Sequence, residues 1–134
     1  MYEAAREIAR DCLALRARRL ERTLTRLYDR ELRGVGVTGS QLGMLVAIAL
    51  MDRPTGAALG DKLDLEKSTV SRNLGRLAAA GLVDDRAGLR VTARGAAAIR
   101  AGHAAWRRAQ AQAQTRLGAP QLALLRSLTM EGMP

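Results

Sequence analysis

Apolar residues recur at steps of three to five along residues 3–33, a stretch that contains neither proline nor glycine. This spacing places the apolar side chains on one stripe of a helix. The stripe consists of Ile8, Cys12, Leu15, Leu20, Leu24, Leu27, Tyr28 and Leu32. Gly34 and Gly36 follow it, and glycine commonly ends a helix. The pattern therefore predicts one long amphipathic helix over residues 3–33.

Three shorter helices are predicted in the middle of the chain, at residues 39–51, 56–63 and 66–80. Thr38 lies three residues before Gln41, and this pair matches a capping box, in which each side chain bonds the other residue's backbone N–H. Thr55 is the expected N-cap of the second helix. Gly81 follows the third helix, at the position where glycine favours termination. The helix over residues 39–51 is apolar on nearly every side, so we expect it to be buried.

Short strands are predicted after Gly81, at residues 82–86 and 89–91, with Ala87-Gly88 as a two-residue hairpin connection. An alanine-rich helix is expected from about residue 92 to 117. A final helix is expected from Pro120 to about Met130, because proline suits the first helical position. The fold class is therefore mainly α with a short β-hairpin wing.

The predicted elements form a single domain over residues 1–134, with a compact middle and two long ends. The middle, residues 38–94, contains three helices and the hairpin. Residues 1–33 and 96–134 carry long helices whose apolar stripes must be covered. A second copy related by a two-fold axis would cover them. We therefore expect a homodimer with these two ends as dimerisation helices; the alternative is that they pack on their own chain.

Composition narrows the class of protein only in part. The chain is 48% hydrophobic but only 2% aromatic, so its core must be aliphatic. The formal net charge of +9 is almost entirely arginine, which suits an anionic partner, but most of the excess lies outside residues 61–94. Cys12 is the sole cysteine, the N-terminus lacks an apolar leader segment, and the longest apolar run, residues 42–51, is too short to cross a membrane. We expect a cytoplasmic protein.

The predicted helix over residues 66–80 has two different faces. Val70, Leu74 and Leu77 follow the spacing of a buried face. The other face carries small hydroxyl side chains and then arginines: Lys67, Ser68, Thr69, Ser71, Arg72 and Arg76. A helix N-terminus suits phosphate, small side chains allow close approach to the major groove, and arginine can reach a guanine edge. Two helices joined by a tight turn and followed by a hairpin predict a winged helix-turn-helix that binds double-stranded DNA.

Almost the whole chain resembles the bacterial MarR family of transcription regulators. The motifs that carry this resemblance are Thr25-Arg26-Leu27-Tyr28-Asp29, Gly36-Val37-Thr38 with Gln41, Ser68-Thr69-Val70-Ser71-Arg72, Gly81-Leu82-Val83 and Val91-Thr92-Ala93-Arg94-Gly95. The resemblance implies a homodimer that binds an imperfect palindrome through successive major grooves. It also implies a repressor that is relieved by a small phenolic or other aromatic effector, or by thiol oxidation.

The predicted wing departs from the family pattern because it is short. Arg86 and Arg90 flank its tip and are the candidate DNA contacts. The usual wing is longer and carries an arginine that enters the minor groove. Asp84 and Asp85 would repel phosphate if they faced it. We therefore expect weaker or narrower DNA binding than that of a relative with a full-length wing.

Cys12 is a candidate redox sensor, because arginine neighbours favour the reactive thiolate form of a cysteine. The hydroperoxide-sensing branch of the family also has a cysteine early in this helix. That branch surrounds its cysteine with tyrosines, whereas this chain has Arg16 where a tyrosine is expected. The alternative is that Cys12 is a small buried side chain at the dimer interface.

No pattern in the sequence indicates an enzyme, a metal site or a cofactor. His103 is the only histidine, and no nucleophile-base set or glycine-rich phosphate loop is present. The short wing and the modest charge of residues 61–94 leave one alternative function, a winged-helix protein–protein interaction module with reduced DNA binding. Trp106 and Tyr28 are the candidate aromatic contacts of an effector, although Trp106 also suits a core or interface position.

Overall fold

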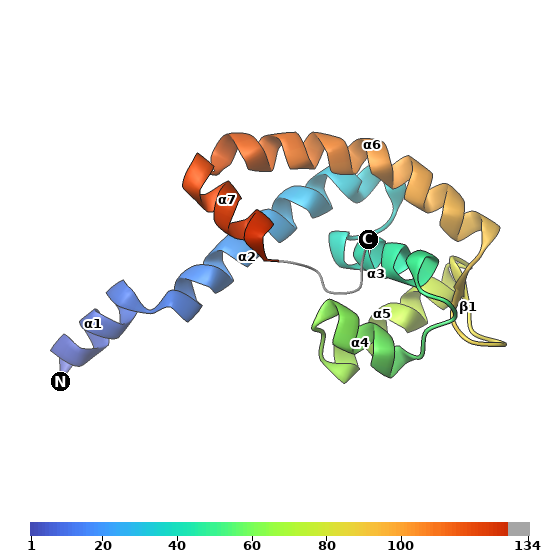
Figure 1. The fold of residues 1–134 in the computed structure, drawn as a ribbon, viewed down its shortest axis with the longest axis horizontal. Helices are drawn as coiled ribbons and strands as arrows, with labels where there is room; N and C mark the ends of the chain where they lie inside the picture. Colours follow the sequence, from blue (N-terminus) through green and yellow to red (C-terminus); the bar gives the residue numbers. More distant parts are fainter. Residues whose placement is uncertain (129–134) are drawn as a thin grey trace.

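A computed structural model describes residues 1–128 of the chain (Figure 1). Its helices are α1 Tyr2–Asp11, α2 Leu13–Leu32, α3 Gly39–Leu50, α4 Gly56–Leu63, α5 Lys67–Ala79, α6 Ala93–Arg116 and α7 Ala119–Ser127. A 3-10 turn at Arg33–Val35 follows α2, and strands β1 Val83–Asp84 and β2 Arg90–Val91 form an antiparallel pair. The predicted class, mainly α with a β-hairpin, is confirmed.

Helix ends lie close to the predicted positions because the expected capping side chains are in place. The Thr38 side chain accepts the Gln41 N–H at 3.1 Å, and the Gln41 side chain accepts the Thr38 N–H at 3.0 Å. The Thr55 hydroxyl caps α4, and the Thr92 hydroxyl caps α6 in the same way. Gly81 adopts a φ of +74° just after α5, a conformation that favours glycine. The predicted end of the last helix, Met130, lies outside the described residues.

The prediction of one continuous helix over residues 3–33 was wrong at Cys12. Cys12 is extended, with φ −68° and ψ 112°, and separates α1 from α2. The guanidinium group of Arg16 donates to the carbonyl oxygen of Arg10, which the break leaves without its helical partner. The described chain buries no residue of α1, so no packing holds α1 in line with α2. In Figure 1, α1 projects from the body of the molecule.

The strands are shorter than predicted because the tip of the hairpin uses other hydrogen bonds. Val83 pairs with Val91 and Asp84 pairs with Arg90, and no further pair extends the ladder. The Arg86 N–H donates to the Asp84 carboxylate at 3.0 Å instead of joining the ladder. Residues 83–91, called the wing from here on, therefore form a compact turn rather than a long ribbon.

The core lies around α3, which is buried on nearly every side as predicted. Met44, Leu45 and Ala47 are fully buried, and Leu59 of α4 and Leu77 of α5 pack into the same cluster. No aromatic residue belongs to this cluster of described residues. The core is therefore aliphatic, as the composition requires.

Helix α6 packs along α2 through small residues (Figure 1). Gly102, Ala105, Ala109 and Ala113 are buried on this side of α6. Polar side chains add to the contact: Glu31 accepts hydrogen bonds from the Arg108 Nε at 3.1 Å and the Gln112 Nε2 at 2.7 Å. Part of the N-terminal stripe is therefore covered by the same chain.

Other apolar side chains at the chain ends remain exposed. They are Ile8, Leu13 and Leu15 near the N-terminus, and Leu124 and Leu128 near the end of the described chain. Within residues 1–128, no single helix is long and apolar enough to cross a membrane. The one combination that passes on length and composition, Leu13–Val35 with Gly39–Leu50, is bent by 77°.

Gly95 supplies a test of the packing between the wing and α6. A Cβ at this position would lie 2.6 Å from Val91 Cγ1 and would overlap the Leu82 carbonyl oxygen, which is backbone and cannot move aside. We expect Gly95→Ala to lower the free energy of unfolding by about 1–3 kcal/mol or more. Urea denaturation measures the change.

The matched control is Gly75→Ala, because a Cβ at Gly75 meets nothing within 4 Å in the described chain. Alanine is favoured over glycine inside a helix, so this variant should keep or raise stability, by up to about 1 kcal/mol. Equal stabilities of the two variants would contradict the tight fit at Gly95.

Candidate nucleic-acid interface

Helices α4 and α5 form a helix-turn-helix around a tight turn. Asp64 ends α4 in the left-handed region, with φ 52°, and the Leu65 N–H donates to the Gly60 carbonyl at 2.9 Å. A Cβ at Gly60 would lie 3.2 Å from the Leu65 carbonyl oxygen and 3.3 Å from Val70 Cγ2. Glycine at this position thus allows α4 and α5 to approach each other closely.

Helix α5 has the two faces that the sequence predicted. Val70 and Leu77 are buried, and Leu74 is half-buried. Among the candidate DNA contacts, Thr69 is half-buried and the others are exposed: Lys67, Ser68, Ser71, Arg72 and Arg76. The structure thus brings all six candidates of α5 together on one helix whose opposite face is seated in the core.

Asn73 is a residue of α5 that the sequence analysis missed. Its side chain is buried, and its Nδ2 donates to the Ser40 Oγ at the start of α3 at 3.2 Å. The position could have been found, because Asn73 lies three residues after Val70 and four before Leu77, on the same face. This hydrogen bond ties α5 directly to α3.

The N-terminus of α5 differs from those of its neighbours. Helices α3, α4 and α6 each begin with a threonine whose hydroxyl accepts a first-turn N–H. Glu66, the N-cap of α5, makes no such side-chain bond. The first-turn N–H groups of α5 are thus not capped by the side chain of Glu66, and such groups are suited to bind an anion.

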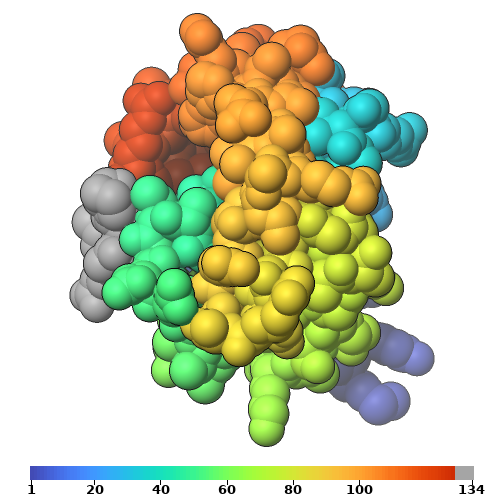
Figure 2. Space-filling view, turned by 90° about the vertical axis from the view of Figure 1, so that its right-hand side faces the viewer, coloured from blue at the N-terminus to red at the C-terminus, as the bar shows by residue number. Residues whose placement is uncertain are grey.

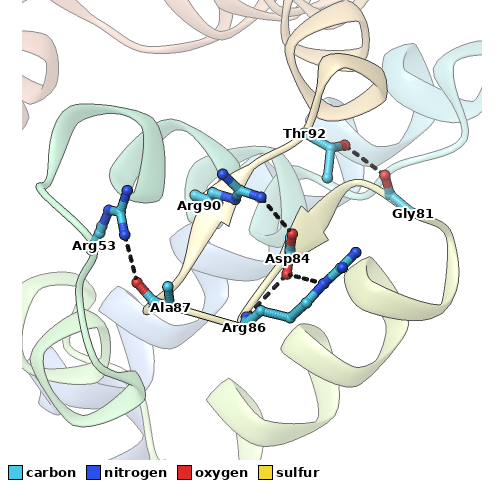
Figure 3. A network of polar contacts seen from close by, with 7 residues as sticks. All are labelled: Arg53, Gly81, Asp84, Arg86, Ala87, Arg90 and Thr92. Atoms are coloured by element: carbon cyan, nitrogen blue, oxygen red, sulfur yellow. Dashed lines mark hydrogen bonds and ion pairs between the residues drawn. The ribbon is translucent and has the colours of Figure 1, made fainter.

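Charged side chains of the wing converge on Asp84 (Figure 3). The Asp84 Oδ1 accepts the Arg86 backbone N–H and lies 3.4 Å from the Arg86 Nε, while Oδ2 lies 2.9 Å from the Arg90 Nη2. The Asp84 side chain is only 13% exposed, whereas those of Arg86 and Arg90 are 88% and 59% exposed. The Arg86 backbone N–H, followed by the Arg90 guanidinium group, lowers the pKa of Asp84 to about 2.

The two wing aspartates have different surroundings. Asp84 is neutralised by both wing arginines, since it lies directly opposite Arg90 in the strand pairing. Asp85 is exposed and makes no hydrogen bond or ion pair within the described chain. Only Asp85 presents an unpaired negative charge at the wing.

Arg53, which the sequence analysis also missed, anchors the tip of the wing. Its Nη1 donates to the Ala87 carbonyl at 3.1 Å. A Cβ at Gly88, where φ is +86°, would lie 2.8 Å from the Arg53 Cβ. Leu89 is buried, and its N–H donates to the Pro54 carbonyl at 3.4 Å. Figure 2 shows the wing, in gold, set between the green α3–α4 region and the yellow-green α5.

The two aromatic effector candidates lie in different places. Trp106 is 39% exposed, stacks on His103 with ring centroids 5.9 Å apart, and lines an apolar cavity of about 510 Å³ between α3 and α6. The hydroxyl of Tyr28 donates to Gln110 and so joins α2 to α6, and burial raises the pKa of Tyr28. Tyr28 is not among the residues that line this cavity.

Cys12 is half-buried at the junction of α1 and α2. Figure 1 shows this junction at the opposite end of the molecule from the wing.

Within residues 1–128, no group of three or more His, Cys, Asp or Glu side chains is placed to hold a metal ion. The residues of α5 and the wing are thus the main concentration of candidate functional groups.

A helix-turn-helix with hydroxyls and arginines on its second helix, followed by a two-stranded wing, defines a winged helix-turn-helix DNA-binding protein. Residues 35–90 match the model of the MarR family. The Mycobacterium tuberculosis transcriptional regulator MosR is 31% identical, with 87% of this chain and 91% of that chain covered and a TM-score of 0.79. No protein of curated function matches the chain.

Two solved structures with DNA are also similar to the chain. MosR in complex with DNA is 34% identical, over 86% of this chain and 94% of that chain, with a TM-score of 0.73. The Mycobacterium tuberculosis MarR-family protein Rv2887 in complex with DNA is 25% identical, over 92% and 99% of the two chains, with a TM-score of 0.69. The chain belongs to the MarR family: it is a DNA-binding transcription regulator, and not an enzyme.

The Asp84 cluster gives a prediction for pH dependence. An unperturbed aspartate titrates near 3.8, and Asp84 titrates at about 2 in the folded protein. Because the folded pKa is lower, the stability that Asp84 contributes is complete above about pH 4 and is lost as the pH falls toward 2. Asp84→Asn should therefore weaken the pH dependence of unfolding between these values, as measured by denaturant titration at several pH values.

Asp85→Asn is the control and should keep the wild-type dependence in this range. A ¹³C NMR titration of the side-chain carboxyl groups provides a direct measurement. A pKa of the Asp84 carboxyl near 3.8, its ordinary value, would show that the contacts with Arg86 and Arg90 do not stabilise the ionised carboxylate.

Proposed function

We propose that the protein is a homodimeric repressor that binds an imperfect palindrome in duplex DNA through α5 and loses affinity for DNA in response to a small-molecule or oxidant signal. The exposed face of α5 carries this proposal, since its serines and arginines are presented together by a helix fixed in the core. The structures of MosR and Rv2887 with DNA support it. Such a regulator would act in the cytoplasm, with the DNA.

The roles proposed for the α5 side chains follow from their order along the helix. Ser68 and Ser71 are small, so the uncapped N-terminus of α5 can approach the major groove, with its N–H groups toward a phosphate. Arg72 and Arg76 are exposed and lie one turn apart, so both can face the same groove. Arginine pairs with guanine through two parallel hydrogen bonds, which makes Arg72 the proposed base contact.

The exposed apolar ends of the chain support a two-fold dimer. The exposed side chains of α1, α2 and α7 include Ile8, Leu13 and Leu124, which are 62%, 79% and 64% exposed. Pairing two copies through these ends would remove the side chains from water. We propose residues 1–33 and 96–134 as dimerisation helices and residues 38–94 as the DNA-binding lobe.

The proposed signal enters through the apolar cavity between α3 and α6. Its lining of Leu42, Val46, Ile99 and Trp106 suits a small aromatic molecule. Ser40 at the start of α3 holds Asn73 of α5, so a ligand that moves α3 relative to α6 would also shift the DNA-binding helix. Oxidation of Cys12 at the junction of α1 and α2 is the alternative signal.

Selection of bound duplexes from a random pool tests the proposed function, and recovery of a palindrome is the expected result. With the selected duplex, Arg72→Ala should lower affinity by about 5- to 150-fold, the equivalent of about 1–3 kcal/mol for a lost contact to a base. Fluorescence anisotropy at fixed salt measures the affinity.

Arg116→Ala is the matched control for charge, because Arg116 is exposed at the far end of α6; since α6 is also a proposed dimerisation helix, size-exclusion chromatography must first show the wild-type oligomeric state for this variant. It should leave affinity for the selected duplex nearly unchanged. Equal losses for the two variants, or a pool without any enriched sequence, would count against readout by α5.

Trp106 is the only tryptophan, so its fluorescence reports on the proposed effector cavity. We expect a hydroxybenzoate to change this fluorescence and to weaken DNA binding over the same concentration range. Gly43 lines the cavity and has open space around its Cβ position, so Gly43→Leu should fill the cavity and abolish both responses. Unchanged responses in this variant would place the effector elsewhere.

A further inference from the structure

The wing holds equal numbers of formal positive and negative charges. Asp84 and Asp85 oppose Arg86 and Arg90 in the sequence. Both arginines are within 3.4 Å of the Asp84 carboxylate, so the opposite charges form ion pairs in the folded protein. A wing of this kind attracts DNA phosphates far less than two unpaired arginines would.

The Asp84 carboxylate is the fixed member of the cluster. Its position is set by β1, by the backbone N–H of Arg86 and by the register that places it opposite Arg90. The two guanidinium groups lie at the surface, where they are free to exchange this carboxylate for a phosphate. A guanidinium group that turns to a phosphate gives up its contact with Asp84, so the exchange gains little in affinity.

Contacts at the tip of the wing favour the conformation in which these charges lie together. The Nη1 of Arg53 donates to the Ala87 carbonyl, and Gly88 lies so close to Arg53 that a side chain at position 88 would collide with it. Buried Leu89 fixes the return strand. Because the arginine side chains are exposed, rotation of these side chains is enough to move them away from Asp84.

We propose that Asp84 is a specificity-determining residue that occupies Arg86 and Arg90 as an internal counter-anion and so lowers the sequence-independent part of the affinity for DNA. This proposal rests on the proposed DNA-binding function. Contacts to phosphate carry no sequence information, whereas contacts to bases do. With the wing neutralised, discrimination depends on α5.

The effect falls mainly on non-specific complexes. When α5 is seated in the major groove, it fixes the distance between the short wing and the DNA. A non-specific complex has no such constraint, so released arginines could turn toward the nearest phosphates. Removal of the Asp84 charge should thus strengthen non-specific binding more than specific binding.

Asp84→Asn and Asp85→Asn provide a matched pair of variants, since each removes one negative charge from the wing and only Asp84 contacts the arginines. We expect Asp84→Asn to raise affinity for a random-sequence duplex by about 5- to 10-fold. The slope of the logarithm of the binding constant against the logarithm of salt concentration should become steeper by about 1–2, since each phosphate contact adds about 0.9 to this slope. Asp85→Asn should produce a much smaller change. The ratio of specific to non-specific affinity should fall only for Asp84→Asn.

The double variant Arg86→Ala with Arg90→Ala completes the test. In that background, Asp84→Asn and Asp85→Asn should have equal effects. When Asp84 is present, the double variant should reduce this slope by much less than about 1.8, the amount expected for the loss of two phosphate contacts. This last measurement needs no substitution at Asp84 and stands even if Asp84→Asn unfolds.

Equal effects of the two asparagine variants in the wild-type background would overturn the proposal. Weaker DNA binding by folded Asp84→Asn would also overturn it, since Asp84 would then orient the arginines toward DNA. If the wild-type protein binds no duplex at any salt concentration, the proposed function fails and this proposal fails with it. Binding by the wild type with no difference between the variants contradicts this proposal alone.

Discussion

Burial of α3 is the constraint on which the rest of the structure depends. Met44, Leu45, Ala47 and Ile48 are removed from water almost completely, and α2, α4, α6 and β2 all pack against this helix. The chain has no phenylalanine, so close approach of aliphatic side chains must supply the hydrophobic stabilisation that aromatic rings often provide. The first backbone N–H groups of a buried helix also need hydrogen-bond partners, and the capping box at Thr38 supplies them at the start of α3.

The same constraint positions α5, the proposed DNA-binding helix. Helix α5 reaches the core through Val70 and Leu77, and through Asn73, whose amide bonds Ser40 of α3. A buried amide restricts the rotation of α5, because its hydrogen bond has a direction that apolar contacts lack. The exposed face of α5 therefore has a defined orientation relative to the rest of the lobe.

Local signals explain how much of the fold was predictable from the sequence. Helix ends were predictable because each depends on residues close together in the chain, such as Thr38 with Gln41, or Gly81. The break at Cys12 was not, because neither glycine nor proline marks it and a bond from Arg16 to the Arg10 carbonyl stabilises it. The short length of the strands was not predicted either, since the alternation of apolar and polar residues does not show that the Arg86 N–H bonds the Asp84 carboxylate instead of the opposite strand.

The candidate site was predictable to the same degree. The exposed face of α5 follows from helical spacing alone, and the structure exposes five of its six candidate residues. The role of Arg53 and the pairing of Asp84 with Arg90 depend on contacts with the α3–α4 loop and across the hairpin, which no local pattern specifies. Trp106 and Tyr28 were grouped as aromatic residues, yet only Trp106 lines the cavity, because side-chain direction on α2 and α6 decides which one faces it.

The positions of the cavity and the wing give α3 and α6 a common role. Ile99 of α6 lines the apolar cavity near Trp106, and it also lines the neighbouring hollow formed with Leu89 and Arg90 of the wing. Both hollows lie along the contact between α3 and α6, and α3 holds α5 through Ser40. A change in the spacing of α3 and α6 would therefore reach the wing and α5 together. Under the counter-anion role proposed for Asp84, such a change would act on DNA binding mainly through the orientation of α5.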